Sequence, residues 1–132
     1  MPTITGGHHV AFTVGNADRN AQWHGNPLGM QVVLKGDDEA VQFRVLAHPD
    51  SGWVIGVRQY PGREEGAFDE FRTGLDHFAF GVPSRAELES WEQQLRAAGI
   101  PFTPTAETPT GSVIVFREPD NIRSEFWLPA GP

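Results

Sequence analysis

The sequence has 132 residues, the length of one domain. Its 10 basic and 17 acidic residues give a formal charge of −7, which argues against a nucleic-acid partner because such binding depends on Lys and Arg contacts to phosphate. The absence of cysteine excludes a disulfide framework, a thiolate nucleophile and a cysteine-bound zinc site. No basic segment followed by an apolar one begins the chain, and no apolar run approaches the ~18 residues of a membrane span, so we expect a cytoplasmic protein that does not associate with membranes.

The first half of the chain predicts a strand, a helix and three more strands. The opening strand covers residues 9–14, where bulky apolar residues alternate with others. Asn16 or Asp18 caps the following helix, and Pro27 limits it to two or three turns. The three strands are expected at residues 31–34, 40–47 and 53–59, separated by turns at 37–38 and 49–52.

The second half predicts the same order of elements. After a strand at residues 77–82, Ser84 and Glu87 form a capping box, and Gly99 and Pro101 end the helix. The helix has an apolar stripe at helical spacing, made of Ala86, Leu88, Trp91, Leu95 and Ala98. Strands are then expected at residues 102–104, 112–116 and 123–128, with a turn at 119–121. Residues 62–73, rich in charge and glycine, either link the two halves or fold over an opening.

These two halves are copies of one unit. Residues 9–14 read H-V-A-F-T-V, and residues 77–82 read H-F-A-F-G-V, at an offset of 68. Trp23 and Trp91 are also 68 residues apart, while the Pro-Asp pairs at 49–50 and 119–120 are 70 apart. Several landmarks in the same order indicate a duplication. We therefore expect a single α+β domain over residues 1–132, with one module at about 5–61 and a second at about 74–129.

The opening strand of each copy has one face that cannot fill a core. Strand alternation places His9 on the same face as Ala11 and Thr13, and it places His77 on the same face as small residues at 79 and 81. The bulky residues lie on the other face, which the helix covers. A face with one histidine and otherwise small side chains is typical of a cavity floor. The alternative is that both histidines are half-exposed strand residues.

Glu125 is the candidate for a third metal ligand. It lies inside an apolar terminal strand, where an unpaired carboxylate is costly to bury. Coordination to a cation resolves this cost, and the alternative is an ion pair with Arg58, Arg117 or Arg123. The counterpart of Glu125 in the first copy is residue 55, 56 or 57, none of which binds metal. His9, His77 and Glu125 therefore predict a three-ligand site for Fe, Mn, Co, Ni or Zn, with positions open to water or substrate.

The chain resembles the vicinal oxygen chelate superfamily, which contains glyoxalases, bleomycin-resistance proteins and extradiol dioxygenases. The resemblance covers nearly the whole sequence. It rests on residues 8–12 (H-H-V-A-F), 28–30 (L-G-M), 75–77 (L-D-H), 118–121 (E-P-D-N) and 124–126 (S-E-F). It implies two βαβββ modules that form a curved, cup-shaped mixed sheet, and a metal chelated by substrate oxygens. The family's ligands fall on His9, His77 and Glu125. The fourth ligand of glyoxalase I falls on Gly56, which argues against lactoylglutathione chemistry.

The resemblance implies a metal-dependent lyase or isomerase acting on a small substrate with adjacent oxygens, in which Glu125 both holds the metal and moves a proton. An Fe(II) extradiol dioxygenase is the second possibility, and it would need His48 and Tyr60 as catalytic groups. A metal-free protein that sequesters an antibiotic or another small molecule is the third. Its aromatic cleft would use Trp53, Trp127, Phe43 and Phe116. Chains of this size in the family often pair, so we expect a homodimer.

Overall fold

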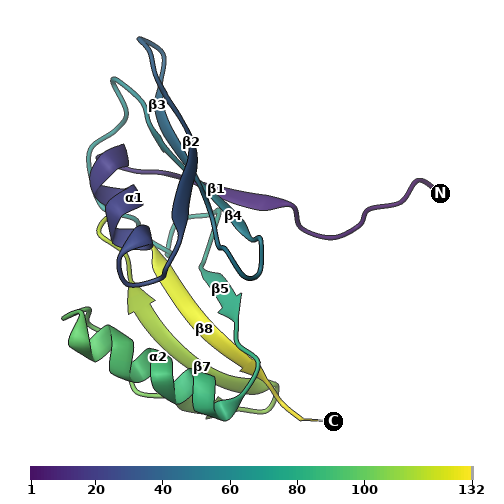
Figure 1. Ribbon diagram of the computed structural model, residues 1–132. Helices are drawn as coiled ribbons and strands as arrows, with labels where there is room; N and C mark the ends of the chain where they lie inside the picture. Colours follow the sequence, from purple (N-terminus) through teal and green to yellow (C-terminus); the bar gives the residue numbers. More distant parts are fainter. Residues whose placement is uncertain (132) are drawn as a thin grey trace. The chain divides into compact units, whose positions relative to one another are not determined.

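The computed structural model describes residues 1–131 and divides into two compact units, Met1–Glu65 and Gly66–Pro132 (Figure 1). The first unit contains one helix and four strands. Its elements are β1 (His9–Thr13), α1 (Ala17–Gly25), β2 (Gln31–Asp37), β3 (Gln42–Ala47) and β4 (Val54–Gln59). The second unit contains β5 (Phe78–Gly81), α2 (Arg85–Ala97), β6 (Ala106–Thr108), β7 (Gly111–Arg117) and β8 (Arg123–Pro129).

Each unit has its own four-stranded mixed sheet, and the two sheets have the same topology. The strand order is β1-β4-β3-β2 in the first and β5-β8-β7-β6 in the second. The opening strand of each unit pairs in parallel with the last one, and the remaining pairs are antiparallel. The α+β class and the duplicated βαβββ order are therefore confirmed.

The predicted assignment of strand faces is also confirmed within each unit. Phe12 of β1 is buried and lies against His24 of α1, whereas His9, Ala11 and Thr13 are exposed. In the second unit Trp91 of α2 stacks on Phe126 of β8, with ring centroids 4.4 Å apart. One face of each sheet is thus a core face covered by a helix. The opposite face, which we call the open face, has the small residues of the opening strand.

Three details differ from the sequence prediction. No strand forms at residues 102–104, where Phe102 makes only an isolated bridge to Phe116, and the strand is β6 instead. Pro101 and Pro104 have no N–H to donate, and Thr105 is held by Glu92 of α2 through both its backbone N and its hydroxyl. Strand β2 runs on to Asp37, three residues beyond its predicted end. Ala86 and Ala98 are exposed, so Leu88 and Leu95 are the fully buried residues of the stripe.

The segment that follows Gly66 is attached to the β7–β8 turn of its own unit. Arg117 makes a bidentate pair with Glu70, with N–O distances of 2.7 and 2.9 Å. Hydrogen bonding to this guanidinium lowers the pKa of the Glu70 carboxyl to about 2. The N–H of Phe68 donates to Asp120 O, and Asn121 Nδ2 donates to Phe68 O. Among residues 1–131, no helix has the length and apolar character that a membrane crossing requires.

Candidate metal site on the open faces

Glu125 occupies the middle of β8 on the open face of the second sheet. Its neighbours in the sheet are Ala79 of β5 and Val115 of β7. The flanking residues Ser124 and Phe126 point to the opposite face, where Phe126 meets Trp91. Glu125 is only 3% exposed, so its carboxylate is buried although it lies outside the helix-covered core.

Arg123, two residues earlier on the same face, compensates this buried carboxylate. Its Nε and Nη2 lie 3.0 and 2.8 Å from Glu125 Oε2. Of the three arginines considered from the sequence, Arg123 is therefore the one that pairs with Glu125. Arg117 pairs with Glu70 instead, and Arg58 contacts Tyr60. Both contacts of Arg123 use Oε2, so Oε1 is directed elsewhere.

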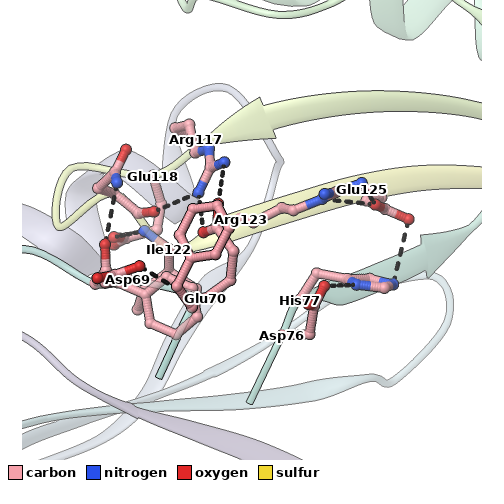
Figure 2. A network of polar contacts seen from close by, with 12 residues as sticks. Asp69, Glu70, Asp76, His77, Arg117, Glu118, Ile122, Arg123 and Glu125 are labelled. Atoms are coloured by element: carbon pink, nitrogen blue, oxygen red, sulfur yellow. Dashed lines mark hydrogen bonds and ion pairs between the residues drawn. The ribbon is translucent and has the colours of Figure 1, made fainter. Parts of the chain in front are cut away.

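His77 faces Oε1 of Glu125. Its Nε2 lies 3.4 Å from this oxygen, while its Nδ1 lies 2.6 Å from Oδ1 of Asp76 (Figure 2). A carboxylate only accepts hydrogen bonds, so His77 Nδ1 carries a hydrogen and donates it to Asp76. Asp76 therefore fixes the ring at Nδ1, and Nε2 is directed at Glu125 on the open face.

His9 lies at the start of β1 in the first unit, also on the open face. Its Nδ1 is 2.8 Å from Nδ1 of His8, so one of these nitrogens donates and the other accepts. In both units the residue directly before the repeated histidine thus engages Nδ1 of that histidine. Nε2 is then the nitrogen left for a ligand or an ion.

The pair formed by His77 and Glu125 fits a divalent cation. Two ligand atoms at about 2.1 Å from one ion, at bond angles of about 90–110°, lie about 3.0–3.4 Å apart. The 3.4 Å between Nε2 and Oε1 falls at the end of this range. Within residues 1–131, neither unit by itself gathers three His, Asp or Glu side chains close enough to hold a metal. His77 and Glu125 lie close together in the second unit, and His9 belongs to the first unit.

Gly56 is the counterpart of Glu125 in the first unit. It pairs with Ala11 in β1, as Glu125 pairs with Ala79 in β5, and both alanines follow the repeated histidine by two residues. Of the three counterparts considered from the sequence, residues 55, 56 and 57, strand register thus selects Gly56. A Cβ at position 56 would lie 3.3 Å from Cβ of Ala11, closer than such atoms normally approach.

The two proposed acid–base residues lie in other surroundings. His48 is in the β3–β4 turn, where its Nδ1 accepts from the backbone N–H groups of Asp50 and Ser51 at 3.3 and 3.2 Å. The hydroxyl of Tyr60 accepts from Arg58 Nε at 2.7 Å. Of the four aromatic residues proposed for a cleft, Phe116 was wrongly placed. It is 1% exposed and stacks on Phe126 in the core, because Ser124, its partner in β8, points to the helix-covered face.

The first unit contains a cavity of about 250 Å³. His9 lies at one end, Ala11 and Gly56 line the floor, and Phe43 and Arg58 line the other end. The place of Arg58 in this cavity was not predicted from the sequence, and neither were the contacts of His8 and Asp76. For the last two, the available signal was their position directly before each repeated histidine.

The family model described as the Glyoxalase/Bleomycin resistance protein/Dioxygenase superfamily matches residues 6–126. The chain, with its two βαβββ units, belongs to this superfamily. A glyoxylase/bleomycin resistance protein/dioxygenase domain from Frankia sp. EAN1pec is 35% identical and has a TM-score of 0.89, over 97% of this chain and all of that one. A comparison with curated proteins found no match.

More distant solved structures share the fold. The fosfomycin resistance protein FosX from Listeria monocytogenes is 16% identical, with a TM-score of 0.75 over 97% of this chain and 96% of that one. A mutant of FosX, complexed with Mn(II) and 1S,2S-dihydroxypropylphosphonic acid, has a TM-score of 0.73 at 16% identity, over 97% and 95% of the chains. A glyoxalase family protein from Enterococcus faecalis is 19% identical, with a TM-score of 0.76 over 93% and 97%.

Proposed function

We propose that the protein is a divalent-metal-dependent enzyme of the lyase or isomerase type, acting on a small molecule with two adjacent oxygens. The observation that carries this proposal is the pair formed by His77 Nε2 and Glu125 Oε1, 3.4 Å apart on an open sheet face. When His77 is neutral, Nε2 and Oε1 are both acceptors, so the pair is complementary to a cation shared by the two atoms. A divalent ion would supply that charge.

His9, His77 and Glu125 are the proposed ligands. Two imidazoles and one carboxylate accept Fe(II), Mn(II), Co(II), Ni(II) or Zn(II) and leave positions for a chelating substrate. When bound, such an ion is a Lewis acid that polarises a carbonyl or stabilises an enolate. Asp76 holds the ring of His77, and Arg123 holds Oε2 of Glu125, so that Oε1 remains directed at Nε2.

The FosX relative that was solved with Mn(II) and a 1,2-dihydroxy phosphonic acid supports the same class of ligand, a small molecule with oxygens on adjacent carbons. We expect the working form to be a homodimer in the cytoplasm. The Fe(II) dioxygenase alternative has less support, because Nδ1 of His48 is used by its own turn and Tyr60 by Arg58. The alternative of a metal-free sequestering protein also has less support, because Phe116, one of the residues proposed for its aromatic cleft, is buried in the core.

The test is metal content of the full-length, untagged protein by inductively coupled plasma mass spectrometry. We expect about one transition-metal ion per chain in the wild type and a loss of most of it in Glu125→Gln. Glu89→Gln, which removes the same charge from an exposed position on α2, is the matched control and should keep the metal.

Two outcomes would contradict the proposal. One is a wild type that binds none of the five ions after reconstitution, which would direct the search to ligand sequestration. The other is an equal metal content in the wild type and Glu125→Gln. Substrate screens would begin with catechols if the ion is iron, and otherwise with hydroxy-carbonyl compounds.

A further inference from the structure

The cavity of the first unit has an apolar floor and one cationic end. Ala11 and Gly56 are paired in the sheet and leave space above them because neither has a long side chain. Arg58 lies four residues along β4 from Val54, the partner of His9. At about 3.3 Å per residue, the two ends of the floor are separated by about 13 Å. Among residues 1–131, none that lines this cavity is Asp or Glu.

Arg58 is held in place before any ligand arrives. Its guanidinium lies over the ring of Phe43 at 5.5 Å and over the ring of Tyr60 at 5.6 Å. Its Nε donates to the Tyr60 hydroxyl at 2.7 Å. Phe43 is itself confined by Gly36, its partner in β2, where an added Cβ would overlap the ring. Such confinement lowers the entropy lost when the guanidinium binds a ligand.

Arg58 forms no ion pair in the part of the chain that the structure describes. No carboxylate lies within ion-pair distance of it among residues 1–131, and its Nη1 and Nη2 donate no hydrogen bond there. Asp38 interacts with Arg58 only at longer range, and its carboxylate accepts from the backbone N–H groups of Ala40 and Val41.

Arg44, on the neighbouring strand, shows the opposite arrangement. It is 5% exposed and pairs with Asp18 of α1 and Asp37 of β2, both at 2.8 Å. Hydrogen bonding to Asp18 and Asp37 raises the pKa of the Arg44 guanidinium, and the same contact with Arg44 lowers the pKa of the Asp18 carboxyl. Arg44 is therefore neutralised by ion pairs within the fold, whereas Arg58 lines the cavity without an ion pair to any of residues 1–131.

We infer that this cavity binds the anionic end of the substrate, a carboxylate or phosphonate that pairs with Nη1 and Nη2 of Arg58 while an apolar body lies over Ala11 and Gly56. This inference rests on the proposed function, because the anionic group is taken to belong to the molecule whose oxygens chelate the metal. It adds a substrate class: a chelating compound with an acidic group at its far end. In a chain of net charge −7, this cavity selects against cations.

The test is an NMR titration of the metal-free, full-length protein, so that anion binding is measured apart from metal binding. The probes are phenylphosphonate and benzoate, with benzylamine as a cation of similar size. We expect saturable shifts at the amides of Ala11 and Gly56 and at Arg58 Nε with both anions, and none with benzylamine. Arg58→Met, which keeps the apolar stem, should weaken anion binding about tenfold or more.

Two further variants make the test specific. Tyr60→Phe removes the acceptor that holds Nε, and should weaken binding by a smaller factor. Arg63→Met removes a cation outside the cavity and should bind both anions as the wild type does. The inference is overturned if neither anion saturates, if benzylamine binds equally well, or if Arg58→Met keeps wild-type affinity. Because the titration uses metal-free protein, its outcome is independent of the metal-content measurement that tests the proposed function.

Discussion

Oδ1 of Asp76 lies 2.6 Å from Nδ1 of His77, on the side of the imidazole opposite Glu125 (Figure 2). The contact fixes which nitrogen carries the hydrogen and turns Nε2 toward Oε1 of Glu125. His8 makes the equivalent contact with His9 in the first unit. In each copy of the module, the residue before the repeated histidine thus contacts Nδ1 of that histidine, through a carboxylate in one copy and an imidazole in the other.

Asp76→Ala should weaken metal binding about 10- to 100-fold, because the ring of His77 loses the acceptor that orients it. Isothermal titration with Mn(II) and Zn(II) measures the effect. Glu65→Gln, which removes one exposed negative charge at the end of the first unit, is the control for overall charge. An unchanged affinity in Asp76→Ala would show that the contact does not position a ligand.

Arg123→Met should lower the free energy of unfolding of the metal-free protein by about 2–3 kcal/mol, because the carboxylate of Glu125 stays buried without its partner. We expect a smaller loss of unfolding free energy than for a fully buried ion pair, because a third of the Arg123 side chain is exposed. Urea denaturation measures the change. Saturating Mn(II) should reduce the deficit, since the ion compensates the same carboxylate. A deficit that is the same with and without Mn(II) would argue against Glu125 as a ligand.

His24 should make the protein acid-sensitive between pH 6.5 and about 4. Burial lowers the pKa of His24 to about 4, while its Nδ1 donates to the carbonyl of Asn20 at 3.0 Å. The unfolded chain takes up a proton at about pH 6.5, so stability falls as the pH decreases through this window, by about 3 kcal/mol in total. His24→Leu should lose this part of the pH dependence in urea denaturation series. His48→Gln should keep it, and a wild-type slope in His24→Leu would refute the assignment.

Substitutions of Asn121 should separate the effect of its backbone conformation on stability from the effect of its side-chain hydrogen bond. It has a φ of 67°, and its Nδ2 donates to Phe68 O at 3.1 Å. Asn121→Ala should cost about 1–2 kcal/mol of unfolding free energy, because it removes this hydrogen bond and because Ala lacks the short polar side chain that lets Asn tolerate the left-handed conformation. Asn121→Gly loses the hydrogen bond but relieves the strain, so it should stay within about 0.5 kcal/mol of the wild type. Equal losses in both variants would mean that the hydrogen bond to Phe68, and not the backbone, determines the effect.

Local patterns in the sequence were sufficient to predict most of the secondary structure and its order. Strand alternation placed His9 and His77 on faces away from the helices, and the repeat narrowed the counterpart of Glu125 to residues 55–57, of which strand register selects Gly56. Ser84 begins α2 as its capping box predicts, with its hydroxyl accepting from Glu87 N. The strand expected at residues 102–104 does not form, because Pro101, Pro104 and the contact between Thr105 and Glu92 override the local apolar pattern, and β6 forms at Ala106–Thr108 instead. That His9 shares one ion with His77 and Glu125 remains a prediction.

The sequence by itself determined the duplicated module, the faces of its strands and the residues available as ligands, because periodicity and capping depend on neighbours within a few residues. Only the tertiary structure decided that Arg123 holds Glu125, that Asp76 orients His77, and that Arg58 lines a cavity. Three arginines were equal candidates along the chain. Strand register and the direction of each side chain, which depend on long-range pairing, determine which of them reaches a carboxylate.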